Sequence, residues 1–193
     1  MHSAPLKGRS GMIRRICVVA ALLLFASSLR AGEASYFPQG TWTTSIYGLY
    51  AKNFTGETAV IGGGTIGGGY YFRDNMSINA ELTGYANNQF GQDASIAAGD
   101  LLLRHHLFHR GRFSFFLDAG AGVSYADHPT PWYGTNFNFI LETGAGTTLQ
   151  LWDNVHLLTG VRYWHLSNAH KEGPAHNPSI NATQIYMGLL FKF

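Results

Sequence analysis

Residues 113–126, FSFFLDAGAGVSYA, decide the fold because their side chains alternate between two chemical types. Every second position carries an apolar side chain: Phe113, Phe115, Leu117, Ala119, Ala121, Val123 and Tyr125. Asp118 belongs to the intervening set. A period of two is typical of a β-strand whose two faces meet different surroundings. This stretch therefore predicts a strand with one continuous apolar face and one face that accommodates a charge.

The same alternation recurs in two later stretches. In residues 137–151 the apolar set opposes Asn138, Glu142 and Gln150, and in residues 179–193 it opposes Gln184, Tyr186 and Lys192. No long stretch has the period of an amphipathic helix, whereas runs rich in β-branched and aromatic residues recur between turn residues. These runs predict eight strands, at 41–51, 57–73, 76–87, 94–108, 113–126, 137–151, 155–167 and 179–193.

The connections between these strands alternate in length. RDN (73–75), HRGR (109–112) and WDN (152–154) are short, whereas KNFTGE, NNQFGQD, DHPTPWYGTN and NAHKEGPAHNP are longer. Short and long connections must therefore lie at opposite rims of a closed sheet. Short turns on one side, long loops on the other and an even strand number are typical of outer-membrane barrels. We predict an all-β, eight-stranded antiparallel transmembrane β-barrel of the outer membrane.

The charged positions indicate which face is interior. Strand parity places charges of both signs together on the face opposite the apolar one: Glu81, Asp100, Arg104, Asp118, Glu142, Arg162 and Lys192. Eight strands leave an interior just wide enough for side chains, so we expect a narrow, filled, polar interior and no pore. The alternative is a soluble lipocalin-like barrel with the apolar face inside. The terminal aromatic Phe193 favours the membrane barrel.

Aromatic residues fall near both expected rims, as the girdles of a membrane barrel do. Trp152, Phe72, Phe108 and Phe113 come near the short turns. The other rim is approached by Tyr47, Trp132, Tyr133, Tyr163 and Trp164.

The N-terminal residues 1–31 predict a secretory signal peptide, with cleavage near Ala31 or Ala34. Basic residues precede the apolar run ICVVAALLLFA, which is too short to span a bilayer. The only cysteine, Cys17, lies in this segment, so the barrel of residues 32–193 would have no disulfide. Five of the 13 lysines and arginines also lie there, which leaves eight against 11 acidic residues and a net charge of −3. We therefore expect no nucleic-acid partner.

Two other signals carry little functional weight. GGGTIGGG (62–69) contains G-x-G-x-x-G at Gly62, Gly64 and Gly67, but no helix is expected after it, so it does not predict a dinucleotide site. Two groups could be considered as metal ligands: His105, His106 and His109, and His170, Glu172 and His176. Spacing alone does not define a site, and we expect solvated rim residues, without metal or cofactor.

The segment 163–181, YWHLSNAHKEGPAHNPSIN, contains the candidate catalytic residues. His165 and Ser167 are two apart and share the face opposite Arg162, so they should point to lipid at the long-loop rim. A serine becomes a nucleophile when an adjacent base takes its proton, and that base needs a third group to orient it. Asn181, at the start of the last strand, shares the lipid face by parity. The alternative reading is three interfacial polar residues.

HLSNA (165–169), followed by a loop, NPSIN (177–181) and a terminal aromatic strand, resembles the PagL-type lipid A 3-O-deacylases, also called acyloxyacyl hydrolases. The resemblance implies an outer-membrane serine esterase that removes the acyl chain at the 3-position of lipid A without a cofactor. It also implies that Ser167 is the nucleophile, His165 the base and Asn168 a contributor to the oxyanion hole. The implied partners are lipid A or lipopolysaccharide as substrate and the surrounding membrane lipids, and a homodimer is left open.

The chain departs from the family pattern at two positions, where Asn181 replaces a glutamate and His170 replaces a glycine. An asparagine can orient an imidazole but does not stabilise imidazolium as a carboxylate does. Glu172 in the loop is a conceivable replacement acid, whereas Glu142 points into the lumen by parity. These departures keep two alternatives open: a barrel of this family with altered or lost activity, and a small structural or adhesive outer-membrane barrel.

Overall fold

The computed structural model describes residues 35–193 except 57, 172 and 174–177. The predicted signal peptide lies outside the described residues. The described strands are β1 (Trp42–Asn53), β2 (Val60–Arg73), β3 (Met76–Asn88), β4 (Ala94–Arg110), β5 (Phe113–Thr130), β6 (Thr135–Trp152), β7 (Val155–Ser167) and β8 (Ile180–Lys192).

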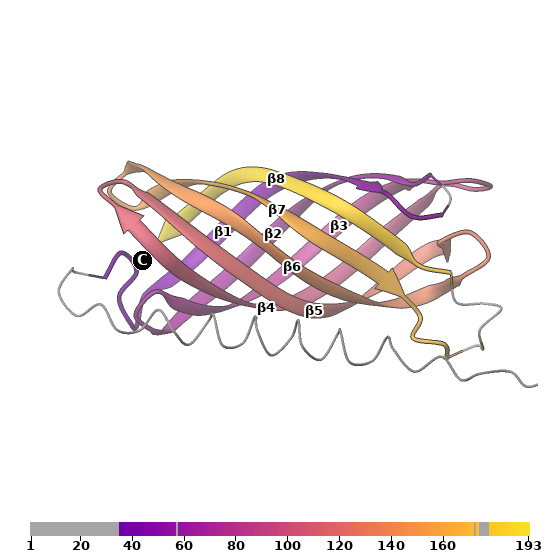
Figure 1. Cartoon of the computed structure of the whole chain (residues 1–193), viewed down its shortest axis with the longest axis horizontal. Helices are drawn as coiled ribbons and strands as arrows, with labels where there is room; N and C mark the ends of the chain where they lie inside the picture. The colour runs from indigo at the N-terminus through magenta and orange to yellow at the C-terminus, as the bar shows by residue number, and fades with distance from the viewer. Residues whose placement is uncertain (1–34, 57, 172, 174–177) are drawn as a thin grey trace, which may run out of the picture. The chain divides into compact units, whose positions relative to one another are not determined.

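Each strand pairs antiparallel with the next, and β8 pairs with β1 to close the barrel (Figure 1). The predicted eight-stranded antiparallel barrel is confirmed. The short turns gather at the end where the C-terminus lies, which we call the short-turn rim, and the longer connections form the long-loop rim. Within the described residues, no helix is long and apolar enough to cross a membrane.

The connection between β5 and β6 differs from the prediction. Residues 127–136 were expected to form a long loop, but β5 continues to Thr130 and β6 starts at Thr135, leaving a four-residue turn. Thr130 and Thr135 are paired, and the Asn138 side chain donates to both of their carbonyl oxygens at 2.8 Å. The predicted strands end where the apolar alternation ends. In the structure, these side-chain bonds hold the hairpin together beyond that point.

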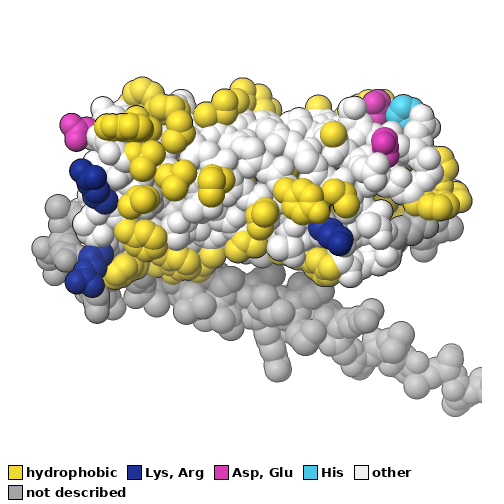
Figure 2. Space-filling view, turned by 90° about the horizontal axis from the view of Figure 1, so that it is seen from above, with side chains coloured by type: hydrophobic (Ala, Val, Ile, Leu, Met, Phe, Trp, Pro, Cys, Tyr) yellow, Lys and Arg dark blue, Asp and Glu magenta, His cyan; other side chains and the backbone are white. Residues whose placement is uncertain are grey.

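The outer face of the barrel is apolar, as the alternation predicts. Val123 and Tyr125 of β5 are 46% and 64% exposed, whereas Asp118 on the other face is 2% exposed. Figure 2 shows hydrophobic side chains spread along the visible flank, with most charged side chains towards the two ends. A lipocalin-like barrel would have the opposite arrangement, so this alternative is excluded.

The interior holds a cluster of paired charges. Arg162 of β7 donates to Glu81 and Asp118 at 2.9 Å and to Glu142 at 3.0 Å. Arg104 of β4 also donates to Asp118, at 3.0 Å. Each of these side chains is at most 5% exposed, and buried charges are tolerated where they are paired and hydrogen-bonded. This cluster joins strands from opposite sides of the barrel.

Two of the aromatic residues predicted for the girdle point inwards instead. Tyr47 is 3% exposed and donates to Glu81 at 2.6 Å, and Trp164 is fully buried. The girdle prediction for both residues rests only on their level along the strand. Strand parity predicts the inward orientation of Trp164 correctly, because it places Trp164 on the same face as Arg162.

The segment before β1 fills the short-turn rim. Phe37 is fully buried, and its ring lies 4.7 Å from that of Tyr71 and 4.6 Å from that of His106. Asn75 connects this segment to the β2–β3 turn through two hydrogen bonds. Its side-chain Oδ1 accepts the Phe37 backbone N–H at 3.1 Å, and its backbone N–H donates to the Phe37 carbonyl oxygen at 2.8 Å. The barrel interior is therefore closed on this side by the chain's own residues.

Candidate active site

The structure brings three of the candidate residues together on the outer face of β7 and β8 at the long-loop rim. His165 and Asn181 are directly paired in the antiparallel ladder between these strands. Ser167 follows His165 on the same face as the last residue of β7. Residues opposite each other in a ladder, and residues two apart on one strand, have adjacent side chains.

The side chains of these three residues form a hydrogen-bonded chain. His165 Nε2 lies 3.1 Å from Ser167 Oγ, and His165 Nδ1 lies 2.8 Å from Asn181 Oδ1. All three side chains are partly exposed, so a lipid at the barrel surface can reach the serine. A hydroxyl, an imidazole and an orienting acceptor in this order are the groups that nucleophilic ester hydrolysis requires.

Asn168, the candidate for the oxyanion hole, directly follows Ser167 in the sequence. Its side chain is buried, with an exposed fraction of 2%. Its Oδ1 accepts the backbone N–H of His170 at 3.0 Å, which leaves the NH₂ group as the donor end of this carboxamide. His170 has a φ of 64°, in the left-handed region that favours glycine. The glycine of the family pattern would suit this backbone, and here Ala169, with a φ of 56°, and His170 adopt it as non-glycine residues.

Four residues that the sequence does not assign to the site surround Asn181. The Tyr163 hydroxyl donates to Asn181 Oδ1 at 2.5 Å, and Asn181 Nδ2 donates to Thr55 Oγ1 at 2.9 Å and to Ser179 Oγ at 3.3 Å. Asn53 Oδ1 accepts the Asn181 backbone N–H at 3.0 Å. Tyr163 could have been found by parity, because it shares the face of His165. Thr55 and Asn53 could not, since closure of β1 on β8 brings them there.

The other candidates lie elsewhere. Glu142 is inside the barrel and bonded to Arg162, as parity predicted, so it does not serve His165. Glu172 and His176 lie outside the described residues. The expectation of a solvated side chain is wrong for His106, which is 4% exposed and bonds to Tyr71 at 3.0 Å and to Ser114 at 2.8 Å inside the barrel. No group of three His, Cys, Asp or Glu side chains suited to a metal ion occurs in the described part of the chain. The glycine-rich stretch 62–69 is part of β2 and leads into β3.

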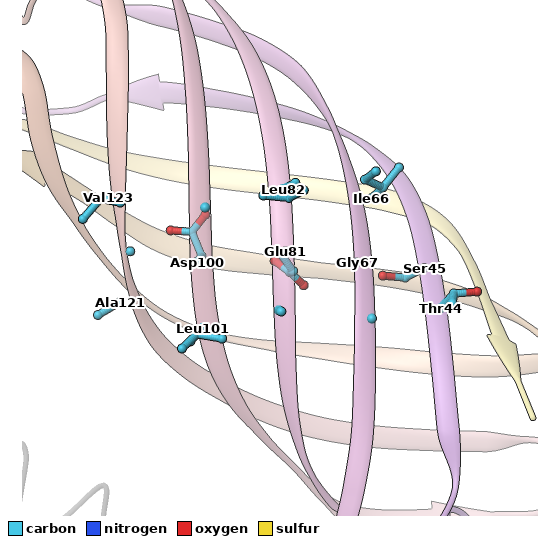
Figure 3. A pocket seen from close by; sticks show the side chains of 14 residues that line it. Thr44, Ser45, Ile66, Gly67, Glu81, Leu82, Asp100, Leu101, Ala121 and Val123 are labelled. Carbon is cyan, nitrogen blue, oxygen red and sulfur yellow. The ribbon is translucent and has the colours of Figure 1, made fainter.

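Two cavities differ in their relation to this site. A groove of about 750 Å³ crosses β1 to β5, between outward residues such as Ile66, Leu82 and Leu101 (Figure 3). None of its lining residues belongs to β7 or β8, so it is separate from the hydroxyl of Ser167. A second cavity, of about 660 Å³, lies at the long-loop rim and includes Thr55 and Asn181 in its wall.

Comparison with solved structures defines the class of the fold. Neisserial surface protein A has a TM-score of 0.64 and 17% identity, over 80% of this chain and all of that chain. The outer membrane protein OprG from Pseudomonas aeruginosa has a TM-score of 0.56 and 12% identity, over 81% of this chain and 97% of that chain. The chain therefore has the fold of the small outer-membrane β-barrels.

The family follows from the sequence. Residues 65–189 match the lipid A 3-O-deacylase (PagL) family. The match covers well over half of the chain, and the chain belongs to this family. The outer membrane enzyme PagL is also among the similar solved structures, with a TM-score of 0.49 and 17% identity over 77% of this chain and 98% of that chain. Among curated protein sequences, none matches this chain significantly.

Proposed function

We propose that the protein is an outer-membrane serine esterase that hydrolyses the 3-O-linked acyl chain of lipid A. The observation that carries this proposal is the hydrogen-bonded chain from Ser167 through His165 to Asn181 on the outer face of a PagL-family barrel. Long loops of such barrels face the cell exterior, so the long-loop rim lies at the outer leaflet, where the ester bonds of lipid A are found. We further propose that the signal peptide directs the chain to this membrane.

In the first half of the reaction, His165 Nε2 takes the proton of Ser167 Oγ as this oxygen bonds to the ester carbonyl carbon. The carbonyl π electrons move to its oxygen, which gives a tetrahedral intermediate. When the intermediate collapses, the bond between the carbonyl carbon and the sugar 3-oxygen breaks, and the imidazolium donates its proton to that oxygen. The acyl chain then remains on Ser167 as an ester.

In the second half, water attacks the acyl-serine with His165 as the base. The bond to Ser167 Oγ breaks, the serine recovers its proton from the imidazolium, and the free fatty acid leaves. Asn181 Oδ1 holds the Nδ1–H of His165 throughout. Asn168, beside the nucleophile, is the proposed donor to the negatively charged oxygen of each tetrahedral intermediate.

Asn181 supports a second candidate function, a barrel of this family with altered or lost activity. A neutral amide holds the imidazole but adds no negative charge beside the imidazolium. Activity would then be weak or directed to another ester. In a purely structural or adhesive barrel, the long loops would carry the function, and Ser167 would be dispensable.

Mass spectrometry of lipid A separates these candidates. Outer membranes that contain the wild-type chain should lose one hydroxyacyl group from lipid A, and membranes with Ser167→Ala at the same level of folded barrel should not. Heat-modifiable gel migration confirms that both barrels are folded. Identical spectra from the two folded proteins would contradict the esterase and favour an altered or non-enzymatic barrel.

A further inference from the structure

The orientation of the Asn53 side chain is determined by backbone groups. Asn53 Nδ2 donates to the Thr55 carbonyl oxygen, and Asn53 Oδ1 accepts the backbone N–H groups of Thr55 at 3.2 Å and Asn181 at 3.0 Å. A backbone carbonyl only accepts and a backbone N–H only donates. Exchanging the nitrogen and oxygen of this amide would break all three bonds, so a single orientation is allowed.

This orientation determines how Thr55 bonds. In the structure the Thr55 hydroxyl donates its one hydrogen to Asn53 Oδ1, an atom that only accepts, in a long bond of 3.4 Å. Thr55 Oγ1 can then only accept in its contact with Asn181, at 2.9 Å. The Asn181 atom that faces Thr55 is therefore Nδ2, and Oδ1 faces His165.

The tautomer of the neutral His165 ring follows from the same logic. Asn181 Oδ1 only accepts, so His165 Nδ1, at 2.8 Å, carries a hydrogen. The other ring nitrogen, Nε2, then presents its lone pair to Ser167 Oγ at 3.1 Å. The reversed amide would put its NH₂ group against Nδ1 and move the ring hydrogen to Nε2, where no proton could be taken from the serine. In serine proteases such a wrong tautomer lowers kcat by about 10⁴.

We infer that Asn53 and Thr55 are positioning residues that select the active tautomer of His165 by orienting the Asn181 amide. This inference rests on the proposed esterase function and adds a requirement specific to this chain. A carboxylate presents two equivalent oxygens and needs no such selection, whereas an amide has two different ends. The backbone groups that fix the Asn53 side chain make this selection, which acts on Asn181 through Thr55.

The test combines Thr55→Val with Asn181→Asp. Valine has the shape of threonine but neither donates nor accepts. In the wild-type background, Thr55→Val should lower kcat about fivefold to tenfold, the effect of one ordinary hydrogen bond. Nitrogen-15 NMR of the barrel in detergent micelles, with the His165 signal assigned by substitution, should show a larger share of the Nε2–H form. In the Asn181→Asp background, Thr55→Val should leave the tautomer unchanged.

Thr183→Val is the matched control, since Thr183 is an exposed threonine two residues after Asn181 on the same strand. It should leave both kcat and the tautomer unchanged. An unchanged tautomer in Thr55→Val, or an equal shift with Asp at position 181, would overturn the inference. The NMR measurement needs no substrate, so the tautomer selection can be tested even if the proposed esterase activity is absent.

The cavity at the long-loop rim carries a second inference. Its wall combines amide and hydroxyl groups with aromatic rings, including Gln89, Phe90, Trp132 and Tyr133. The wall is held from two sides: Gln89 Nε2 donates to the carbonyl oxygens of Gln92 and Pro129 at 2.9 Å, and Gly91 packs so closely on the Trp132 ring that a Cβ atom there would clash with it. These contacts join the β3–β4 loop to the β5–β6 hairpin and fix the wall of the cavity.

The geometry points to this cavity as a saccharide subsite for the headgroup of the glycolipid substrate. Flat aromatic rings beside amide and hydroxyl groups suit the apolar faces and hydroxyls of a sugar, and the cavity of about 660 Å³ has room for one. Asn181 lies in its wall and bonds to His165, so a sugar placed there can contact the Asn181 end of the hydrogen-bonded chain that leads to Ser167. This inference also rests on the proposed function.

Phe90→Ala tests the subsite, since Phe90 is 62% exposed and its loss should not unfold the barrel. We expect KM for lipid A to rise severalfold, while KM for a p-nitrophenyl ester of a hydroxy fatty acid stays unchanged. Trp152→Ala, at a similarly exposed aromatic residue of the short-turn rim, is the control. Acyl-free glucosamine disaccharide should bind to Ser167→Ala and more weakly to Ser167→Ala with Phe90→Ala, a readout independent of catalysis.

Equal KM changes for both esters, or no disaccharide binding, would overturn the subsite. Binding of unrelated soluble glycans with the same affinity would contradict a headgroup-specific role.

Discussion

Replacing Asn181 by aspartate should make the proposed esterase faster. Aspartate has the shape of asparagine, so the 2.8 Å contact with His165 Nδ1 and the bond from Tyr163 can both persist. The change adds one negative charge next to the imidazolium that forms when His165 takes the serine proton. In its role as base the ring starts uncharged and gains its charge as it takes the proton, so this attraction acts mainly on the transition state.

Coulomb's law sets the expected magnitude. Two unit charges about 4 Å apart attract by about 1 kcal/mol in water and about 4 kcal/mol at an effective dielectric constant of about 20. The site is partly exposed at the barrel surface, so we expect about 1–2 kcal/mol. At about 1.4 kcal/mol per tenfold, kcat should rise about fivefold to thirtyfold.

Single-turnover release of hydroxy fatty acid from purified lipid A, followed by mass spectrometry, measures this rate at equal amounts of folded barrel. The double variant with Ser167→Ala should be inactive, which excludes hydrolysis by another route. An unchanged or slower rate in correctly folded Asn181→Asp would refute the reasoning that the neutral amide limits stabilisation of the imidazolium.

Three further predictions concern the site and the barrel. Tyr163→Phe removes one donor to Asn181 Oδ1 and should lower kcat about threefold to tenfold, as expected for about 1 kcal/mol, in the same release assay. Arg162→Met removes the arginine that pairs with Glu142 and one of the two that pair with Glu81 and Asp118, and should destabilise the barrel by about 3–5 kcal/mol, measured by urea unfolding in lipid vesicles. An unchanged midpoint would contradict a structural role for the charge cluster. Phe37→Ala should cost about 3–5 kcal/mol in the same unfolding assay while ester release stays at the wild-type rate, and a selective loss of activity would show that the short-turn rim acts on the site.

Some features of the site were predictable because parity needs only local chain geometry. Successive side chains of a strand point to opposite faces, so Arg162 inside implied His165 and Ser167 outside. The same rule placed Asn181 on the outer face. The resemblance carried by HLSNA and NPSIN suggested their roles, and the family match over residues 65–189 supports the family assignment.

Other features were not accessible in this way. The extension of β5 and β6 depends on side-chain bonds from Asn138, which the hydrophobic pattern does not record. The girdle prediction is wrong for Tyr47 and Trp164, which point into the barrel. Aromatic residues occur both at membrane interfaces and in barrel interiors, so residue type alone does not distinguish the two positions. Pairing in the ladder decides which residue lies opposite His165, and a shift of one residue would have turned the Asn181 side chain inwards.

The sequence by itself determined the number of strands, the apolar exterior, the charged interior and the face on which Ser167, His165 and Asn181 lie, because these follow from a period of two along each strand. Only the tertiary structure decided how Asn181 is oriented. Thr55 lies 126 positions from Asn181 in the chain and reaches it because β1 closes on β8. Hydrogen bonds depend on the distance and direction between atoms, and barrel closure sets these for residues that are far apart in sequence.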